Sequence, residues 1–169
     1  MSCRDTSGRK PRTVKTPYEE FVDIVIKAEI DGRPRHELIL DVGPTPACLL
    51  SIGFAPLRVA VKAKTIGKIF FDHGLTRRQI ARIPAMLAEP LAIYTSETQP
   101  ATVVVLTYEL NAGYPIIIPV GQGRPVGRGP SVNLIMSMYG KEGPDPRPRW
   151  QAAGLLLWQS GTPKRKGPG

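Results

Sequence analysis

Three strongly β-branched runs follow one another near the middle of this sequence and constrain its fold more than any other feature. They are LAIYTS (91–96), TVVVLTYEL (102–110) and YPIIIPVG (114–121). Val, Ile and Thr are enriched in strands because their branched side chains pack well on a pleated surface. The connections ETQPA and NAG are short enough for hairpins. We therefore predict an antiparallel meander, which the runs NLIMSMYG (133–140) and GLLLWQS (154–160) extend to four or five strands.

Mixed elements are expected before the meander. The stretch EEFVDIVIKAEI (19–30) alternates partly and favours a strand, although a helix at its start also fits the pattern. After a DGRPR turn, HELILDV (36–42) is the expected return strand. TPACLLSIG (45–53) predicts a short helix with Thr45 as its cap, and LRVAVKAKTIGKIFF (57–71) begins as an alternating strand.

Two consecutive helices are predicted around Pro84. Thr76 is a good N-cap for a helix over 77–82, and Pro84 restarts the helix, which continues to Ala88. A further helix is expected at 147–153. The fold class that these elements predict is α+β: an antiparallel meander sheet of four to five strands with the N-terminal helices packed on one side.

The length of 169 residues suits one domain. We assign it to residues 17–160 and expect the basic segments 1–16 and 161–169 to be disordered tails. The chain has 23 Lys and Arg against 14 Asp and Glu, a net charge of +9. This excess favours an anionic partner, of which nucleic acid is the commonest, although basic tails alone could supply it. Inside the domain the excess is concentrated at 58–82, which holds seven basic residues and one acidic residue, Asp72.

Cysteines, histidines and carboxylates are too few for several kinds of site. The sequence has two Cys and two His and no Cys-x-x-Cys pair, so neither a structural zinc site nor a disulfide framework is expected. Paired-carboxylate chemistry lacks obvious acids. We predict no metal and no cofactor. No apolar run is long enough to cross a membrane and no secretory signal is recognisable, so we expect a cytoplasmic protein without a membrane partner.

His73 is the leading candidate for chemistry. It lies in DHGLT, between the basic stretch and the helix that Thr76 caps. An imidazole titrates near neutral pH, and beside the cations Lys68, Arg77 and Arg78 it has the properties that phosphodiester cleavage needs. The alternative is a loop histidine that only hydrogen-bonds to the start of the helix.

Hydroxyl-bearing side chains form the second set of candidates. On a strand, Ser137 and Tyr139 share a face and Lys141 follows near the strand end, so a hydroxyl, a phenol and an ammonium would lie together. The alternative is an ordinary solvent-facing side of a half-exposed sheet. Ser96 ends the first meander strand, where its hydroxyl could bind a phosphate oxygen or simply close a turn.

The order of motifs from about residue 42 to 160 resembles that of a known group. DVGPTPACLLSIGF is followed by KTIGK, DHGLT, IPAMLAEPLAIYTSET, VVVLT, PIIIPV, MSMYGK and GLLLWQS. This order is similar to that of the phage-associated nuclease-like domains grouped with the barnase, EndoU, colicin and RelE ribonucleases, the BECR fold. The resemblance implies a small α+β fold with helices on one side of an antiparallel sheet, and metal-independent cleavage of RNA.

The resemblance also implies roles for individual residues. The His-Gly-Leu turn matches the family's histidine to His73, the Ser-ending strand matches a hydroxyl to Ser96, and the last motif matches Ser137, Tyr139 and Lys141. Basic residues near the histidine are expected to bind RNA. They are Lys64, Lys68, Arg77 and Arg78.

The predicted function is therefore that of a metal-independent endoribonuclease, similar to a toxin or effector, with RNA as its partner. The ribose 2′-OH would attack the adjacent phosphate and leave a 2′,3′-cyclic phosphate. One alternative is a non-enzymatic phage or mobile-element factor that binds nucleic acid or an acidic host protein through the basic 58–82 surface. Another is a toxin whose inhibitor protein covers that surface. Delivery into a host or recipient cell is compatible with either enzymatic reading.

Overall fold

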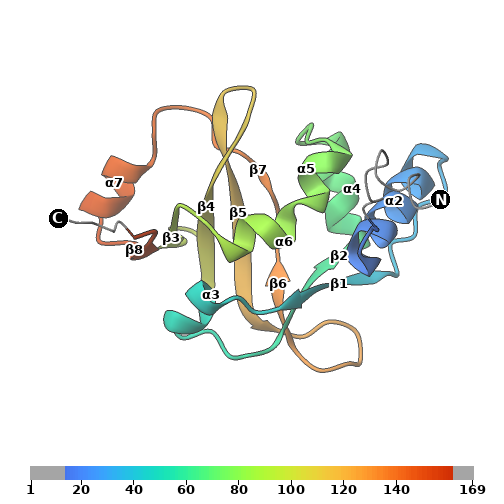
Figure 1. Ribbon diagram of the computed structural model, residues 1–169, viewed down its shortest axis with the longest axis horizontal. Helices are drawn as coiled ribbons and strands as arrows, with labels where there is room; N and C mark the ends of the chain where they lie inside the picture. Colours follow the sequence, from blue (N-terminus) through green and yellow to red (C-terminus); the bar gives the residue numbers. More distant parts are fainter. Residues whose placement is uncertain (1–13, 162–169) are drawn as a thin grey trace, which may run out of the picture.

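One mixed sheet organises residues 14–161, the part of the chain that the computed structural model describes (Figure 1). The predicted tails, 1–16 and 161–169, lie almost entirely outside these residues. The sheet has eight strands in the order β1-β2-β6-β5-β4-β3-β8, and β7 also pairs with β5. The strands are β1 (Ile39–Pro44), β2 (Arg58–Lys62), β3 (Ala92–Thr95), β4 (Thr102–Asn111), β5 (Tyr114–Arg124), β6 (Val132–Ile135), β7 (Tyr139–Gly140) and β8 (Leu156–Gln159).

The centre of the sheet confirms the predicted meander. β3, β4 and β5 pair antiparallel in succession, so that Val104 lies opposite both Tyr94 and Pro119. The sheet is larger than the four to five strands expected, and it is not purely antiparallel, because β2 pairs in parallel with β6. β1 pairs with β2 at one edge and β8 with β3 at the other. A parallel pair of distant segments is not made by a hairpin turn, so it leaves no local signal in the sequence.

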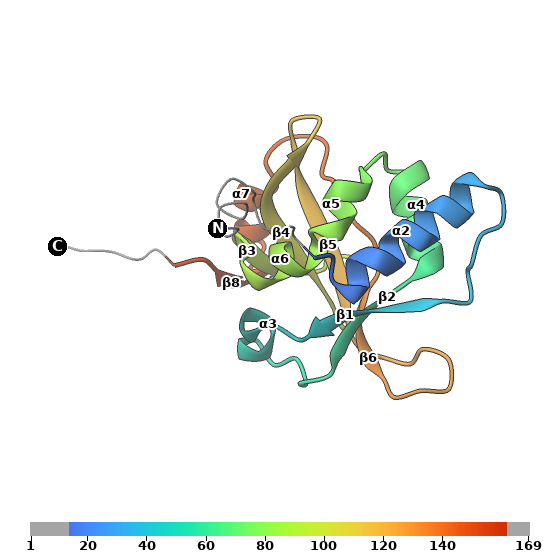
Figure 2. The same ribbon diagram turned by 45° about the vertical axis from the view of Figure 1, so that its right-hand side comes forward.

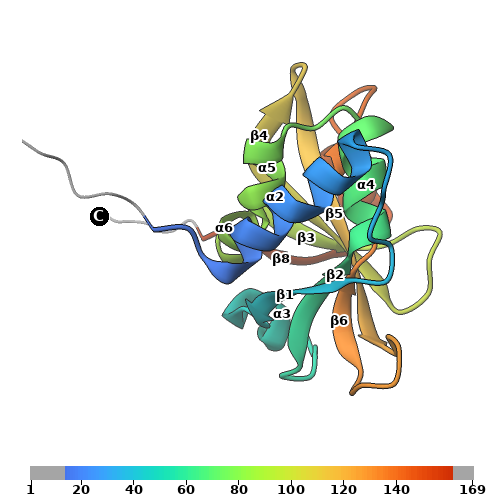
Figure 3. The same cartoon turned by 90° about the vertical axis from the view of Figure 1, so that its right-hand side faces the viewer.

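The helices that precede the meander cover one face of the sheet (Figures 2 and 3). They are α2 (Pro17–Ile30), α4 (Ala63–Phe71), α5 (Arg77–Ala81) and α6 (Ile83–Ala88). Their buried side chains form one core with the facing sides of the strands, and Val25, Ile66, Ile83 and Ile118 are fully buried in it. Burying a side chain of this kind stabilises the fold by about 1.5–3 kcal/mol. Two further short helices in the described part of the chain are α3 (Ala47–Ser51) and α7 (Arg147–Ala152).

Residues 19–30 belong to the helix α2 and do not form the predicted strand. Thr16 and Glu19 make a capping box, in which each side chain accepts a hydrogen bond from the backbone N–H of the other. Pro17 occupies the first turn, where its missing N–H costs nothing. The buried residues of the helix recur at intervals of three and four. They are Tyr18, Val22, Val25 and Ile26. The prediction was wrong because partial alternation in a short window also fits a helix with one apolar face.

The segments around α3 differ in part from the prediction. β1 begins at Ile39 and pairs with β2, not with residues 19–30. A short helix does follow it, but its N-cap is Pro46, and the hydroxyl of Thr45 instead donates to the carbonyl of Leu57. The stretch after β2, which the alternation left unassigned, is the helix α4.

The helices around Pro84 confirm the prediction from capping residues. Thr76 caps α5 in a second capping box with Gln79, whose N–H it accepts at 3.1 Å. α6 restarts at Ile83 with Pro84 in its first turn. α7 lies where a helix was predicted near the C-terminus.

The other face of the sheet is only partly covered. On β4, Val103 and Val105 belong to the helix-side core, whereas Val104 and Leu106 lie on the opposite face. There α7 places Trp150 over a small second cluster, and a third small cluster covers the β2–β6 side. Ile117, Trp150 and Tyr139, which form or pack against the second cluster, also border the candidate site.

Candidate active site

The turn between α4 and α5 fixes the backbone of His73. The N–H groups of Asp72 and His73 both donate to the carbonyl of Lys68, at 2.8 and 3.1 Å. Gly74 has a φ of +69°, a left-handed conformation that a side chain would strain. Leu75 is buried, so the turn is anchored on both sides of the glycine. The side chain of His73 itself remains exposed to solvent.

Ser137 contacts His73, although the two residues are far apart in the sequence. Its Oγ lies 3.4 Å from Nε2 of His73, a long hydrogen bond between residues 64 positions apart. The predicted continuous strand over 133–140 is wrong, because β6 ends at Ile135 and β7 begins at Tyr139. In the interruption Met138 is fully buried in the helix-side core, which leaves Ser137 on the outside. The site depends on this break between β6 and β7, because a continuous regular strand would have no interruption at Ser137.

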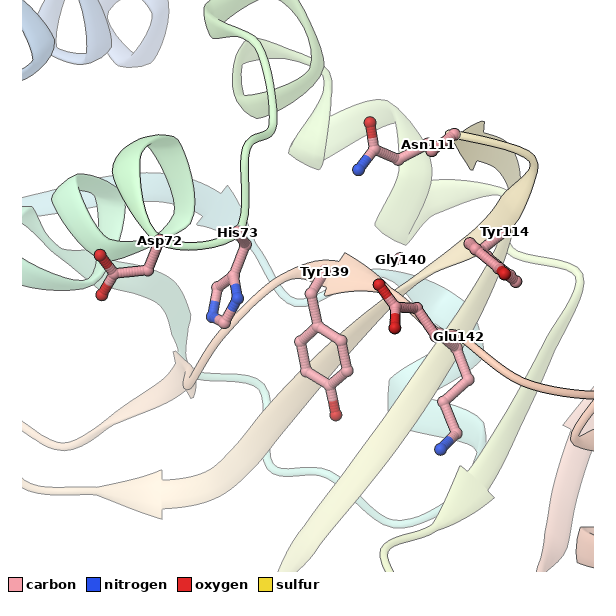
Figure 4. A pocket seen from close by; sticks show the side chains of 9 residues that line it. Asp72, His73, Asn111, Tyr114, Tyr139, Gly140 and Glu142 are labelled. Atoms are coloured by element: carbon pink, nitrogen blue, oxygen red, sulfur yellow. The ribbon is translucent and has the colours of Figure 1, made fainter.

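Tyr139 forms one wall beside the imidazole. The ring centroids of His73 and Tyr139 lie 5.4 Å apart at an interplanar angle of 39°. Figure 4 shows the two rings side by side, while the carboxylate of Asp72 points away from them. Tyr139 is half-buried, and this burial raises the pKa of its phenol above the usual value. The group is therefore a neutral hydroxyl at neutral pH, able to donate a hydrogen bond.

Two adjoining hollows surround these residues. The first, which we call the His73 hollow, measures about 390 Å³ and runs from His73 to the β4–β5 turn. The second, which we call the Ser96 hollow, measures about 400 Å³ and lies between the loop after β3 and the open face of the sheet. Tyr139 and Lys141 line both of them. The hollows therefore adjoin at these two residues, and we refer to the pair as the groove; Ser137 lies in the wall of the second hollow and contacts His73.

Ser96 lies in this groove but not next to His73. Its Oγ accepts hydrogen bonds from the backbone N–H groups of Thr98 and Gln99, at 3.2 and 3.1 Å. The hydroxyl thus closes a turn, as the alternative reading of the sequence allowed. A contact between Ser96 and a phosphate stays a prediction. Such a phosphate would lie in the Ser96 hollow.

The basic stretch 58–82 is less positive than its composition indicates. Three of its arginines have carboxylate partners: Arg58 with Asp41, Arg77 with Asp23 and Arg82 with Glu109. Within residues 14–161 the other four basic residues of the stretch have no such partner. They are Lys62, Lys64, Lys68 and Arg78. Lys64 and Lys68 are one helical turn apart on α4, on its exposed side, so free positive charge is concentrated on the helix that leads to His73.

Several groove residues escaped the sequence analysis. Asn111 and Tyr114 line the His73 hollow from the β4–β5 turn, which the sequence marked only as a tight connection. Glu142 lines it beside Lys141. Polar residues in a short turn were the only available signal. Among residues 14–161 no three His, Cys, Asp or Glu side chains gather closely enough to hold a metal ion.

The chain belongs to the family of the phage MuF C-terminal domain, whose family model matches residues 68–164. The match covers more than half of the chain and includes every predicted site residue except Lys64. It confirms the association with phage proteins that the motif order indicated, whereas a place in the BECR nuclease group stays a prediction. No curated protein and no solved structure matches the chain significantly. Between residues 14 and 161, no helix combines the length and apolar character needed to cross a bilayer.

Proposed function

We propose that this MuF C-terminal domain is a metal-independent endoribonuclease that cleaves RNA by transesterification. The observation that carries the proposal is the convergence of an imidazole, a hydroxyl and a neutral phenol at one open groove, from His73, Ser137 and Tyr139. Such groups are what a proton-transfer reaction at a phosphate requires. A phage toxin or effector acting in the cytoplasm of a host or recipient cell would use this activity.

His73 is the proposed general base. It removes the proton of the ribose 2′-OH, and the 2′-oxygen attacks the adjacent phosphorus. The bond from phosphorus to the 5′-oxygen of the next nucleotide then breaks, and an acid protonates the departing oxygen. Tyr139 is a candidate for this second role because its phenol lies beside the imidazole and is protonated at neutral pH, and Lys141 is the other candidate. The products are a 2′,3′-cyclic phosphate and a free 5′-hydroxyl.

Fixed donors would stabilise the negative charge that develops on the non-bridging oxygens. Ser137 contacts the imidazole, Lys141 lines both hollows, and Ser96 lies in the Ser96 hollow. A preorganised donor of this kind contributes about 2.7–4 kcal/mol to the transition state in comparable oxyanion sites. Basic residues outside the groove would attract the phosphate backbone. They are Lys64, Lys68, Arg78 and, in spite of its ion pair, Arg77.

The test is a cleavage assay with mixed tRNA and a short single-stranded RNA, in EDTA and at low salt. We expect cyclic-phosphate products from the wild type and a rate about 10²–10⁴-fold lower from His73→Ala. His36→Ala is the matched control, because His36 is the other histidine and lies against Glu29, at 2.9 Å. A substrate with 2′-deoxyribose at every position should resist cleavage. No cleavage, or full activity of folded His73→Ala, would refute the assignment.

A non-enzymatic nucleic-acid or protein binder is the second candidate. The observation that favours it is the group of four basic side chains on 58–82 that have no acidic partner among the described residues. Such a binder needs no imidazole. Salt-sensitive retention of RNA that survives His73→Ala, without cleavage, would support it. Loss of retention on neutralising Lys64, Lys68 and Arg78 would locate the surface, and absence of both cleavage and retention would favour an acidic host protein as partner.

A further inference from the structure

We infer that the Ser96 hollow binds one nucleobase of the RNA, next to the phosphate that the 2′-oxygen attacks when His73 removes its proton. The inference rests on the proposed function and extends it from the reacting groups to the recognition of the substrate. The hollow, about 400 Å³, is within the size range of small-molecule sites. Its two sides differ in chemistry, as a planar heterocycle with a polar edge requires.

The floor of the hollow is formed by sheet side chains and is largely apolar. Val104 and Pro119 are cross-strand partners on β4 and β5, and Ile117, two residues before Pro119, lies on the same face of β5. Tyr139 and Trp150 border this floor with aromatic rings. Sheet side chains and aromatic rings are surfaces on which bases stack, and stacking contributes about 1–3 kcal/mol per base. Val104 and Pro119 remain partly exposed on this face, whereas Ile117 is buried in the second cluster.

The opposite side is a polar loop that is held rigid. Its turn is closed by Ser96, as described above, and Glu97 makes two hydrogen bonds with the guanidinium of Arg149, at 2.8 and 3.0 Å. Glu97 also accepts from Nε1 of Trp150. From the other end, Arg124 donates to the carbonyls of Pro100 and Ala101. A loop fixed in this way before binding loses little conformational entropy when a ligand arrives.

Two side chains of this rigid loop carry hydrogen-bonding groups but make no hydrogen bond within the described part of the chain. Thr98 and Gln99 donate from their backbones to Ser96, but neither side chain makes a hydrogen bond to residues 14–161. Both line the hollow. A hydroxyl and a carboxamide offer donors and acceptors to the edge of a base whose face lies on the apolar floor.

The location of the hollow connects the two parts of the substrate. Tyr139 and Lys141 line both hollows, and Ser137 lines the Ser96 hollow while its hydroxyl contacts His73. A base in the Ser96 hollow would therefore direct its own 3′-phosphate towards the imidazole. Thr98 and Gln99 are specificity-determining residues in this arrangement, not catalytic ones.

The experiment measures the affinity of the four ribonucleoside 3′-monophosphates and of inorganic phosphate, with the fluorescence of Trp150 as one readout. The protein is compared with the double variant Thr98→Ala, Gln99→Ala and with Ser131→Ala, an exposed loop control without a side-chain partner. We expect at least one nucleotide to bind tighter than phosphate. The double variant should lose that preference by about tenfold or more, with phosphate affinity and thermal stability unchanged, and should raise KM for RNA more than it lowers kcat.

The outcomes separate the two proposals. Cleavage of RNA with no effect of the double variant on nucleotide affinity, base preference or KM would overturn the base site and leave the nuclease standing. Nucleotide binding that depends on Thr98 and Gln99 without any cleavage would support the base site and refute the nuclease. Nucleotides that bind no tighter than inorganic phosphate would overturn the base site in either case.

Discussion

Asn133 donates a hydrogen bond of 2.8 Å to the hydroxyl of Thr45, a residue 88 positions earlier in the chain. The side chain of Asn133 is fully buried, and each part of its amide is used: the NH₂ group also donates to the carbonyl of Ala55, and the oxygen accepts from the N–H of Gly123. The amide thus joins β6 to the α3 region and to the end of β5. It lies next to the parallel pair β2–β6, which no hairpin connects, and helps to hold this side of the sheet together.

Replacing this amide should destabilise the fold strongly. Asn133→Ala removes all three hydrogen bonds of a fully buried amide, each worth about 1 kcal/mol, so we expect a loss of about 3 kcal/mol in the free energy of unfolding. Urea denaturation measures it. Ser131→Ala, two residues away but exposed, should stay within about 0.5 kcal/mol of the wild type. A loss of less than about 1 kcal/mol in Asn133→Ala would show that other groups hold this edge.

Alkaline pH should unfold the chain partly through Tyr18. Its hydroxyl is buried and donates to the carbonyl of Ile80 at 2.8 Å, and burial raises its pKa well above the ordinary value. The unfolded chain releases this proton at about pH 10, whereas the folded chain retains it. The contribution to stability is therefore complete below that pH and is lost as pH rises towards the folded-state pKa.

Tyr18→Phe tests this sign. We expect the variant to lose about 1 kcal/mol at neutral pH, from the missing hydrogen bond, and to show a shallower fall in stability at alkaline pH. Tyr139, whose pKa is also raised, preserves part of the slope. The measurement is the free energy of unfolding of both proteins across the alkaline range. An unchanged slope against pH in Tyr18→Phe would contradict the assignment to Tyr18.

The capping box before α5 should be worth a measurable part of the stability. Thr76→Ala removes the acceptor for the N–H of Gln79 and should cost about 1 kcal/mol, while Thr76→Ser keeps the oxygen and most of the stability. Thermal or urea unfolding compares the two. Equal losses in both variants would mean that packing of the threonine methyl, and not the cap, stabilises this helix.

Signals within a few residues of each other were readable from the sequence, and signals between distant segments were not. Thr76 with its helix and the β-branched runs of the meander are local patterns, and both are confirmed. Residues 19–30 alternate partly, as a strand does, but they form a helix, and the local signal for it is the capping box of Thr16 and Glu19. The parallel pairing of β2 with β6 has no local signature.

Only part of the candidate site was predictable from the sequence. His73, Ser137 and Tyr139 were predicted to lie at one site, and the structure brings them together. Asn111, Tyr114 and Glu142, which also line it, were not predicted, and neither was its geometry. The sequence placed Ser137 and Tyr139 on one strand face, whereas the chain breaks between β6 and β7 and turns Ser137 towards His73. That break depends on Met138 entering the core from the other side, which is a packing outcome of the whole sheet. The ion pair of Arg77 was equally unpredictable, because its partner Asp23 lies on α2, 54 residues away.

Tyr139→Phe should separate the chemistry from the packing of the groove. The ring remains against His73 and the second cluster, but the hydroxyl, which has no hydrogen-bond partner within residues 14–161, is removed. We expect a fall in kcat for RNA cleavage of about 10²-fold with little change in stability. Tyr114→Phe is the matched control, since Tyr114 lines the same hollow from the far side. Equal activities of the two variants would remove Tyr139 from the proposed mechanism.

The unpaired lysines of α4 should account for most of the salt dependence of RNA binding. Lys64 and Lys68 have no acidic partner among the described residues, whereas Arg58 is held by two hydrogen bonds to Asp41. Each phosphate contact with a single strand contributes about 0.7 to the slope of log K against log salt, so Lys64→Gln, Lys68→Gln together should reduce that slope by about 1.4. Arg58→Gln should leave it nearly unchanged, because its guanidinium is already committed to a carboxylate. Binding titrations over a range of salt concentrations, with His73→Ala protein to prevent cleavage, give both slopes. A larger effect of Arg58→Gln than of the lysine pair would place the RNA on the β1–β2 edge of the molecule and not along α4.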